Sequence, residues 1–407
     1  MIKVQGKYSG AKVFTDNIEQ EAIDQLKKLC DLPFTKGCKV RIMPDTHVGV
    51  GCVIGFTADL GDKVIPNIVG VDIGCGMLTV ELGDTKVDVK KLDEIIRKHI
   101  PSGKSTHEGR IVRYEKLQEL HCYRDLKRTK RIERSIGTLG GGNHFIEVGK
   151  DSKGKSYLVI HSGSRNLGTQ VAQIYQNLAI DLCSGKESYF KEREELIQEY
   201  KKAGRRKEIQ KALKELKKKY DELEPEFPKQ LCYLTGEFKE RYLHDMNICQ
   251  EYALLNRETM ADIILKKLVG RELKRFEYFN TTHNYINFED NIIRKGSISA
   301  YKGEKVLIPI NMRDGSLICI GKGNEDWNYS APHGAGRIMS RTKAKETVTL
   351  EEFKQSMNGI YTTSVSKSTL DEAPMVYKPM EEIVKNIHDT VDIIDVIKPI
   401  YNFKAES

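Results

Sequence analysis

The sequence contains no apolar run long enough to cross a membrane. Such a helix needs about 18 to 20 consecutive apolar residues, whereas hydrophobic side chains make up 39% of these 407 residues and charged ones 30%. The first seven residues, Met1 to Lys7, also lack the apolar stretch of a secretory signal. We therefore expect a cytoplasmic protein that does not contact a membrane.

The sequence also lacks the cysteine spacing of a disulfide framework or a zinc ribbon. Its nine cysteines are an odd number, and no two of them form a C-x-x-C pair. In a long chain without a secretory signal this pattern predicts reduced thiols, most of them small core residues. No internal repeat is found.

Glycine-bounded apolar runs alternate with helical patterns, which predicts an α/β fold. Helices are expected after a cap at Asp16 and at about 88–99, and helical periodicity dominates 168–269. Strands are expected at 40–42, 53–56, 68–71, 77–80, 157–161, 276–279, 306–310 and 317–320. We predict one large domain, residues 1–407, of glycine-rich mixed sheets with flanking helices. It carries an inserted charged helical hairpin within 185–232.

The positive charge is concentrated in one segment. The chain has a net charge of +8, and residues 201–220 hold ten lysines and arginines against two glutamates. This segment therefore accounts for the whole excess, because the remaining residues sum to zero. It is either a solvated helical arm or a contact for a polyanion.

Four glycine-rich stretches place polar side chains where a ligand could approach the backbone. Asp72 and Cys75 lie three residues apart in Gly70–Met77, where they could share a metal or form a structural turn. Asn143 and His144 follow three glycines in Gly140–Glu147, a loop suited to phosphate or metal. His161 ends an apolar strand before Ser-Gly-Ser-Arg, as a ligand or as part of a tight turn.

The fourth stretch is His333–Arg337, in which small residues leave space around the imidazole and Arg337 offers a fork for phosphate. His283-Asn284 adds a further imidazole, and Asp45 with His47 lies in another glycine-bounded loop. One carboxylate, one thiol and several histidines exceed the needs of a single metal. A two-metal site with a bridging thiolate would use them all, and Mn, Zn and Fe all suit this donor set.

Together these stretches resemble the RtcB family of RNA 3′-phosphate ligases, and the match runs nearly end to end. The motifs that carry it are Met43–His47, Gly70–Gly76, Gly140–Glu147, His161–Arg165, His283-Asn284, His333–Arg337, Asp371–Lys378 and Tyr401–Lys404. Each one is weak alone, but their order and spacing are highly specific.

The resemblance implies a GTP-dependent RNA ligase with two Mn²⁺ ions. Cys75 would bridge the ions, with Asp72 and His144 at one and His161 and His283 at the other. His333 would attack the α-phosphorus of GTP and form a histidine–GMP adduct. The guanylate would activate an RNA 3′-phosphate, which can arise from a 2′,3′-cyclic phosphate, for attack by a 5′-hydroxyl during RNA repair or tRNA splicing.

The resemblance also implies a guanine nucleotide site. Guanine would lie near Glu147, Ser316, Tyr377 and Lys404, and the GMP phosphate near Asn143 and Gly334, Ala335 and Gly336. The remaining implied contacts are His144, Phe145, Ile146, His283, Asn284, Pro309, Ile310, Asn311, Met312 and His333. The family's Pro-Gly-Ser-Met-Gly loop is replaced here by Pro309–Gly315, so we expect altered GMP contacts there.

Two other functions fit part of the pattern. A dinuclear metal phosphohydrolase would use the same Asp, Cys and His cluster but not His333 or Lys404. A non-catalytic RNA-binding protein would use the basic arm but leave the cluster unexplained. RNA contact is also expected from Arg124, Lys127, Arg128, Lys130, Arg131 and Arg134, which lead into Gly140–His144. An activating protein partner is possible.

Overall fold

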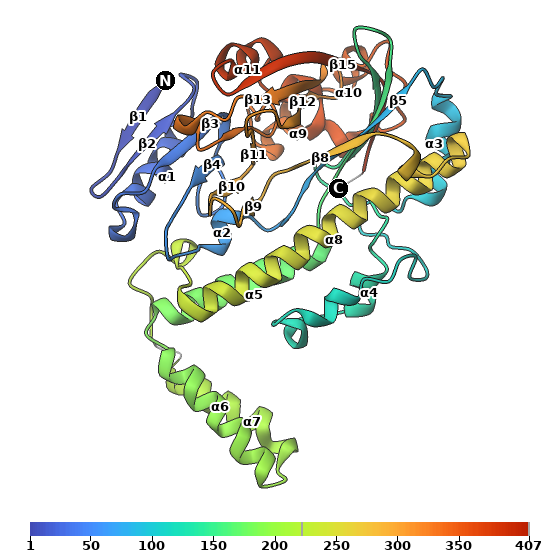
Figure 1. The fold of residues 1–407 in the computed structure, drawn as a ribbon. Helices are drawn as coiled ribbons and strands as arrows, with labels where there is room; N and C mark the ends of the chain where they lie inside the picture. The colour runs from blue at the N-terminus through green and yellow to red at the C-terminus, as the bar shows by residue number, and fades with distance from the viewer. Residues whose placement is uncertain (221–222, 406–407) are drawn as a thin grey trace.

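The computed structural model describes residues 1–220 and 223–405 and has the mixed α/β architecture that the sequence predicts (Figure 1). Two large sheets form the body, and helices pack around them. The boundaries 1–407 and 185–232 stay predictions.

The strands form a six-stranded, a seven-stranded and a two-stranded sheet. The first has the order β1 (Ile2–Gln5), β2 (Gly10–Val13), β3 (Val40–His47), β4 (Ile54–Ala58), β10 (Ile293–Lys295), β9 (Tyr285–Ile286). The second has the order β12 (Lys305–Asn311), β13 (Gly315–Gly321), β15 (Val391–Lys404), β6 (Phe145–Lys150), β7 (Ser156–Ser162), β5 (Gly76–Gly83), β8 (Tyr278–Thr282). The third pairs β11 (Ser297–Ser299) with β14 (Ser330–Pro332).

The helices differ widely in length. They are α1 (Gln20–Cys30), α2 (Pro66–Val69), α3 (Val89–His99), α4 (Thr129–Glu133), α5 (Arg165–Cys183), α6 (Glu187–Lys202), α7 (Ile209–Tyr220), α8 (Gly236–Val269), α9 (Arg341–Thr347), α10 (Leu350–Ser356) and α11 (Met380–Ile387). The long α8 packs against α5, α3 and strands β5 and β7, so it supports the sheet that carries the candidate site.

The predicted helical hairpin projects from the body. Helices α6 and α7 pack against each other and extend away from α5 and α8 (Figure 1). Both helices lie within the predicted range 185–232, of which residues 221–222 lie outside the described residues. Within the described part of the chain, no helix combines the length and apolar character that crossing a bilayer requires.

Three local predictions are wrong or shifted. Residues 68–71 are not a strand, because Pro66 begins the short helix α2 and Gly70, with φ of 103°, ends it. Asp16 does not cap α1, which begins at Gln20 after Glu19. In the segment between Asp16 and α1, the side-chain amide of Asn17 donates a hydrogen bond to the Glu382 carboxylate. The strand expected at 276–279 is β8, two to three residues later.

Candidate functional site

Five predicted metal-ligating residues come together at one end of the seven-stranded sheet. Asp72 and Cys75 lie in the turn between α2 and β5. His144 directly precedes β6, His161 lies near the end of β7, and His283 directly follows β8. Strands β6, β7, β5 and β8 are consecutive neighbours in this sheet, so these ends meet.

Short distances connect the five side chains into two overlapping groups. Cys75 Sγ lies 3.5 Å from His144 Nε2 and 3.3 Å from His161 Nε2. His144 Nε2 is 3.0 Å from Asp72 Oδ2, and His161 Nε2 is 3.4 Å from His283 Nε2. The groups are therefore Asp72, Cys75 and His144, and Cys75, His161 and His283, with the thiol in both.

The orientation of the imidazoles fits metal binding. His144 Nδ1 lies 2.8 Å from the Leu139 carbonyl and His161 Nδ1 lies 3.2 Å from that of Asn143. Donation to a carbonyl fixes the proton on Nδ1 and leaves Nε2 as a free lone pair. The Nε2 lone pairs of the two rings thus converge on Cys75 Sγ, an arrangement that a cation would stabilise.

The pKa shifts of these side chains are also consistent with metal binding. Burial and nearby cationic groups hold the pKa of His161 and His283 well below the usual range, which favours neutral imidazole. Burial and the Asp72 charge raise the pKa of Cys75 well above its usual value. A thiolate at Cys75 would therefore need a positive ion beside it, as metal coordination supplies.

Residues from α8 and one glycine fix the backbone around this cluster. Arg257 is 1% exposed and donates from Nη1 to the carbonyls of Gly74 and Ser162. It thereby joins the start of β5 to the end of β7. A side chain at Gly163 would collide with the Asp72 carboxylate, so glycine is required there for the close approach.

His333 lies next to the cluster, and its imidazole is held by a buried carboxylate. Asp45 Oδ2 is 2.6 Å from His333 Nδ1 and also accepts the His333 backbone N–H at 3.2 Å. Asp45 is fully buried, whereas the side chain of His333 is 16% exposed. The ring of His333 packs edge-on against that of His283, with centroids 4.8 Å apart. A proton on Nδ1 leaves the free lone pair of the His333 ring on Nε2.

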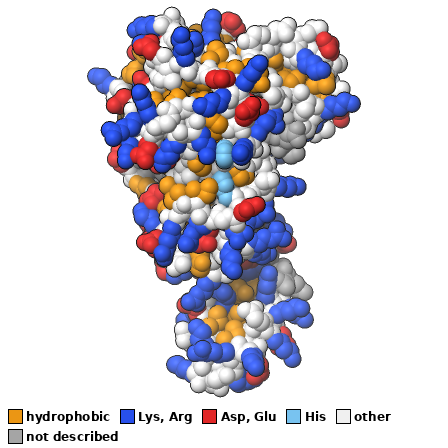
Figure 2. All heavy atoms as spheres, turned by 90° about the vertical axis from the view of Figure 1, so that its right-hand side faces the viewer, with side chains coloured by type: hydrophobic (Ala, Val, Ile, Leu, Met, Phe, Trp, Pro, Cys, Tyr) orange, Lys and Arg blue, Asp and Glu red, His pale blue; other side chains and the backbone are white. Residues whose placement is uncertain are grey.

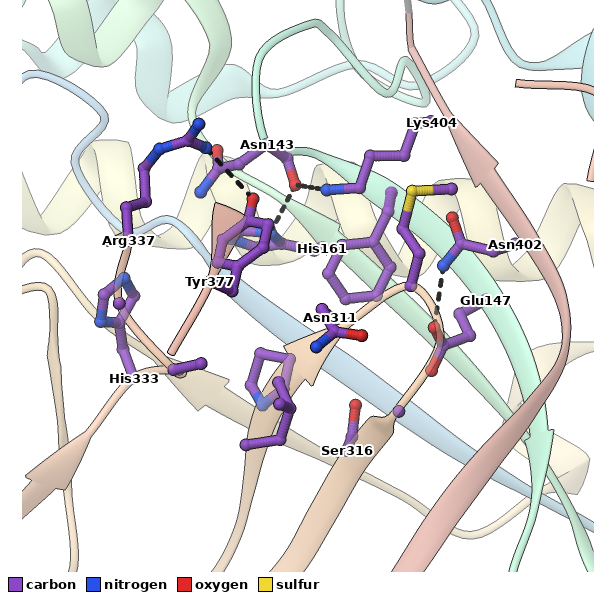
Figure 3. A pocket seen from close by; sticks show the side chains of 18 of the residues that line it. Asn143, Glu147, His161, Asn311, Ser316, His333, Arg337, Tyr377, Asn402 and Lys404 are labelled. Carbon is purple, nitrogen blue, oxygen red and sulfur yellow. Dashed lines mark hydrogen bonds between the residues drawn. The ribbon is translucent and has the colours of Figure 1, made fainter. Parts of the chain in front are cut away.

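A cavity of about 190 Å³ opens beside His333 and His161 (Figure 3). Its lining residues are His47, Asn143, Phe145, Glu147, His161, Pro309, Ile310, Asn311, Met312, Gly315, Ser316, His333, Gly334, Ala335, Gly336, Arg337, Arg341, Tyr377, Asn402 and Lys404. Gly336 has a φ of 75°, and a side chain there would collide with the Asp45 backbone. The His333–Arg337 loop can therefore lie against β3 only with glycine at this position.

Buried polar atoms without partners gather in this cavity. Among residues 1–220 and 223–405, no hydrogen-bond partner is found for Glu147 Oε1, Ser316 Oγ and Asn402 Oδ1. Asn402 Nδ2 donates to the other Glu147 oxygen at 2.8 Å. Burial raises the pKa of Glu147 to about 8, against smaller opposing effects of Asn402 and Lys404. Unpaired buried polar atoms are costly, so a polar ligand would satisfy them.

Lys404 and Tyr377, which line the cavity, are both held by the buried carboxylate of Glu372. Glu372 is 2% exposed, forms an ion pair with Lys404 and accepts a hydrogen bond from Tyr377 Oη at 2.6 Å. Arg341 Nη1 is 2.7 Å from its other oxygen. Burial opposes ionisation of Glu372, but the charges of Lys404 and Arg341 outweigh burial and lower its pKa. The two cations near this wall are thus fixed by a charged carboxylate.

Four predicted nucleotide contacts do not line the cavity. Ile146 is fully buried in the core, because alternate residues of β6 face opposite sides and Phe145 and Glu147 face the cavity. His144 and His283 belong to the cluster of five potential metal ligands described above. Asn284, with φ of 83°, donates to the Asp72 carbonyl and accepts from the Gly296 N–H, so it supports the Asp72 turn.

The unusual loop at 309–315 forms the tight connection between β12 and β13. Asn311 Oδ1 accepts from the backbone N–H groups of Arg313 and Asp314, and the Arg313 side chain pairs with Asp314. Pro309 to Met312 nevertheless line the cavity, together with Gly315 and Ser316. The residues of this loop therefore form part of the wall, and the cavity beside them stays open.

Sequence reasoning missed several residues that complete the site. Arg341, Asn402 and Glu372 were not selected, although Glu372 lies in the Asp371–Lys378 motif and Asn402 in Tyr401–Lys404. Arg257 and Asn256 lie within the regular pattern of α8 and carry no local signal. Asn256 Oδ1 accepts from the N–H groups of Gly137 and Thr138, which shapes the approach to His144.

Comparison with known proteins identifies the family. The model of the family described as tRNA-splicing ligase RtcB matches residues 25–125 and 121–405. RNA-splicing ligase RtcB1 of Escherichia coli strain ATCC 25922 is 28% identical over 427 aligned residues, covering 95% of each chain. RNA-splicing ligase RtcB of E. coli K12 is 28% identical over 429, again covering 95% of each.

An archaeal relative matches along most of its length as well. The tRNA-splicing ligase RtcB of Archaeoglobus fulgidus is 27% identical over 461 aligned residues, which cover 91% of this chain and 88% of the relative. The family model alone spans nearly the whole sequence. The chain described here belongs to the RtcB family.

Proposed function

We propose that this protein is a GTP- and Mn²⁺-dependent RNA ligase. It joins an RNA 3′-phosphate or 2′,3′-cyclic phosphate end to a 5′-hydroxyl end through a histidine–GMP adduct, in RNA repair or tRNA splicing. Family membership supports the reaction class. The observation that carries the proposal is the contact of His333 with the buried Asp45 carboxylate, between the cluster of five potential metal ligands and the polar cavity.

His333 acts as the nucleophile toward the α-phosphorus of GTP. Asp45 holds the proton on Nδ1, so the lone pair of Nε2 forms the new P–N bond while the bond to pyrophosphate breaks. The positive charge that develops on the imidazolium is stabilised by the Asp45 carboxylate. Because Asp45 also accepts the His333 backbone N–H, it fixes the position of the ring as well as its tautomer.

The cavity binds the guanine base. A Glu147 carboxylate can accept from the ring N–H and the exocyclic amine of guanine, which adenine does not offer in this pattern. The unpaired atoms of Ser316 and Asn402 lie in the same cavity. Lys404 is 3.4 Å from the Asn143 carbonyl and can donate to the guanine carbonyl beside its contact with Glu372.

The phosphates lie at the His333 side of the cavity. The Gly334–Gly336 backbone lines this side, and Arg337 lies beside His333 in Figure 3. Asn143, whose carbonyl contacts both Lys404 and His161, lies between the base and the phosphates. The five-donor cluster would hold two divalent ions, Mn²⁺ in this proposal, with the Cys75 thiolate shared between them. Bound ions would offset the charge of the phosphates and orient them for in-line attack.

Labelling with GTP tests the proposal. Protein incubated with α-labelled GTP and Mn²⁺ should acquire an adduct that is labile in acid and stable in alkali, as a phosphoramidate behaves. His333→Ala should remove the label, whereas His388→Ala, at an exposed imidazole elsewhere, should not.

Two outcomes would contradict the proposal. Equal labelling of His333→Ala would show that another residue carries the guanylate. Release of phosphate from a nucleotide or RNA end without any adduct would favour the dinuclear phosphohydrolase instead.

A further inference from the structure

A second large cavity lies where the helical hairpin joins the body, away from the nucleotide site. It has a volume of about 420 Å³. Helices α6 and α7 supply one wall, and α5, α8 and the segment before α4 supply the other. Its lining residues are His121, Cys122, Asp125, Ile174, Tyr175, Asn177, Leu178, Asp181, Lys186, Tyr189, Phe190, Arg193, Lys217, Tyr220, Phe238 and Arg241.

The lining combines aromatic rings with cations. Tyr189 packs against Phe190 and Tyr220 with ring centroids 5.3 and 5.5 Å apart, and Phe190 lies 5.9 Å from Phe238 on α8. Four cationic side chains, Lys186, Arg193, Lys217 and Arg241, line the same space, against the two carboxylates Asp125 and Asp181. Asp181 is engaged with Lys186 at 3.0 Å. The cavity is therefore both aromatic and cationic.

The body wall of the cavity is rigid because one buried carboxylate holds it. Asp245 is fully buried and accepts the backbone N–H groups of His121 and Cys122 at 2.9 and 3.0 Å. It also accepts from Tyr175 Oη at 2.8 Å. The body wall of the cavity is thus held by hydrogen bonds between α5, α8 and the 121–125 segment.

We propose that this cavity binds a single-stranded segment of the RNA substrate, with a base on the aromatic wall and phosphates on Arg193 and Lys217. Aromatic platforms bordered by cations are the common means of binding single strands. The inference rests on the proposed RNA ligase function and extends it to a contact outside the reaction centre.

The charge distribution supports RNA as the occupant. Residues 201–220, which carry the whole excess of positive charge, belong to the hairpin whose helices α6 and α7 line this cavity. Figure 2 shows Lys and Arg side chains along the face that runs from the body to the hairpin, with hydrophobic side chains exposed between them. The 121–125 wall continues along the chain into α4, which carries the exposed Lys130 and Arg131, and then into Gly140–His144.

Binding of a non-reactive RNA tests the cavity directly. The probe is a fluorescein-labelled single-stranded RNA of about 16 nucleotides with hydroxyl groups at both ends, measured by anisotropy at about 50 to 200 mM salt. Arg193→Gln with Lys217→Gln should reduce the salt slope by about 1.4, because each phosphate bound on a single strand contributes about 0.7. Tyr189→Leu should weaken binding about tenfold with an unchanged slope.

A matched control separates the cavity from general charge. Lys207→Gln with Lys211→Gln removes the same charge from exposed positions of the hairpin outside the cavity. It should change affinity less than twofold. Photocrosslinking of 4-thiouridine RNA to the unsubstituted protein should label peptides containing Tyr189 or Phe190, which requires no variant to fold.

The outcomes distinguish this inference from the proposed function. Unchanged RNA affinity in the Arg193, Lys217 and Tyr189 variants, or crosslinks confined to other peptides, would overturn the cavity as an RNA site. All these variants should still form the GMP adduct, because the cavity takes no part in guanylylation. If the unsubstituted protein forms no adduct while the RNA results hold, the proposed reaction fails and the RNA site stands.

Discussion

Asp45 Oδ2 accepts both the ring Nδ1–H and the backbone N–H of His333, although the two residues lie 288 positions apart in the sequence. The carboxylate reaches across from β3 to the loop after β14. This contact gives His333 one tautomer and one orientation.

Replacement of Asp45 by Asn should slow adduct formation while preserving the shape of the site. Asparagine can still accept a hydrogen bond but cannot stabilise the imidazolium charge, so we expect a loss on the order of 10³-fold. Single-turnover labelling with GTP measures the rate, and circular dichroism checks the fold. A rate within threefold of the parent protein would show that Asp45 only supports packing.

The shared thiol should affect both metal ions. Cys75→Ala removes the one side chain common to both donor groups, so the bound Mn²⁺ should fall by more than one equivalent and GTP labelling should cease. Asp72→Ala should affect mainly one ion, because Asp72 belongs to one group. Metal analysis after dialysis decides this, with Cys38→Ala, at a half-buried thiol elsewhere, as the control. Parental metal content in Cys75→Ala would exclude the bridge.

Glu147 should make GTP binding dependent on pH. Burial raises the pKa of the free carboxyl to about 8, and donation from guanine would favour the ionised form. Binding of GTP should therefore release a proton from Glu147. The affinity for GTP should increase by up to about tenfold per pH unit as the pH rises toward 8, and then level off. Calorimetry at several pH values measures it. Glu147→Gln should bind more weakly and lose this dependence; a flat profile in the parent would rule out an ionised contact.

The basic residues of the α4 segment should contribute to RNA ligation. Neutralising Arg128, Lys130 and Arg131 should weaken ligation and flatten its salt dependence by about 0.7 units for each single-stranded RNA phosphate that is no longer bound. Labelling by GTP alone should be unaffected. Ligation assays at several salt concentrations test this, with Lys207, Lys211 and Lys214 on the hairpin as a matched triplet. A larger effect of the hairpin triplet would place the main RNA-binding surface there.

Local patterns predicted the hairpin and most strands because glycine turns, β-branched runs and Glu/Lys/Leu periodicity are local signals. They failed at 68–71, where a single proline converts an apolar run into helix α2. The motifs identify the five potential metal ligands and His333, and the structure brings these six residues together. Their assigned roles stay predictions.

Long-range partners could not be read from the sequence. The sequence marks Asp45 only as part of an expected loop, whereas the structure places it in β3, and nothing near it in the chain indicates contact with His333. Arg257 and Asn402 reach the site because of the packing of α8 and the pairing of β15 with β6. Such contacts depend on the completed fold, so local composition carries no signal for them.

The position of β15 has a consequence for folding. This strand follows every other strand in the sequence, yet it lies between β13 and β6 and joins the two halves of the seven-stranded sheet. The β12–β13 pair cannot join the β6–β7–β5–β8 part of the sheet until β15 is in place. Pairing of β15 with β6 closes a loop of more than two hundred residues. Such distant pairing slows folding. The nucleotide cavity, which needs Asn402 and Lys404 from this strand, should be among the last parts of the molecule to form.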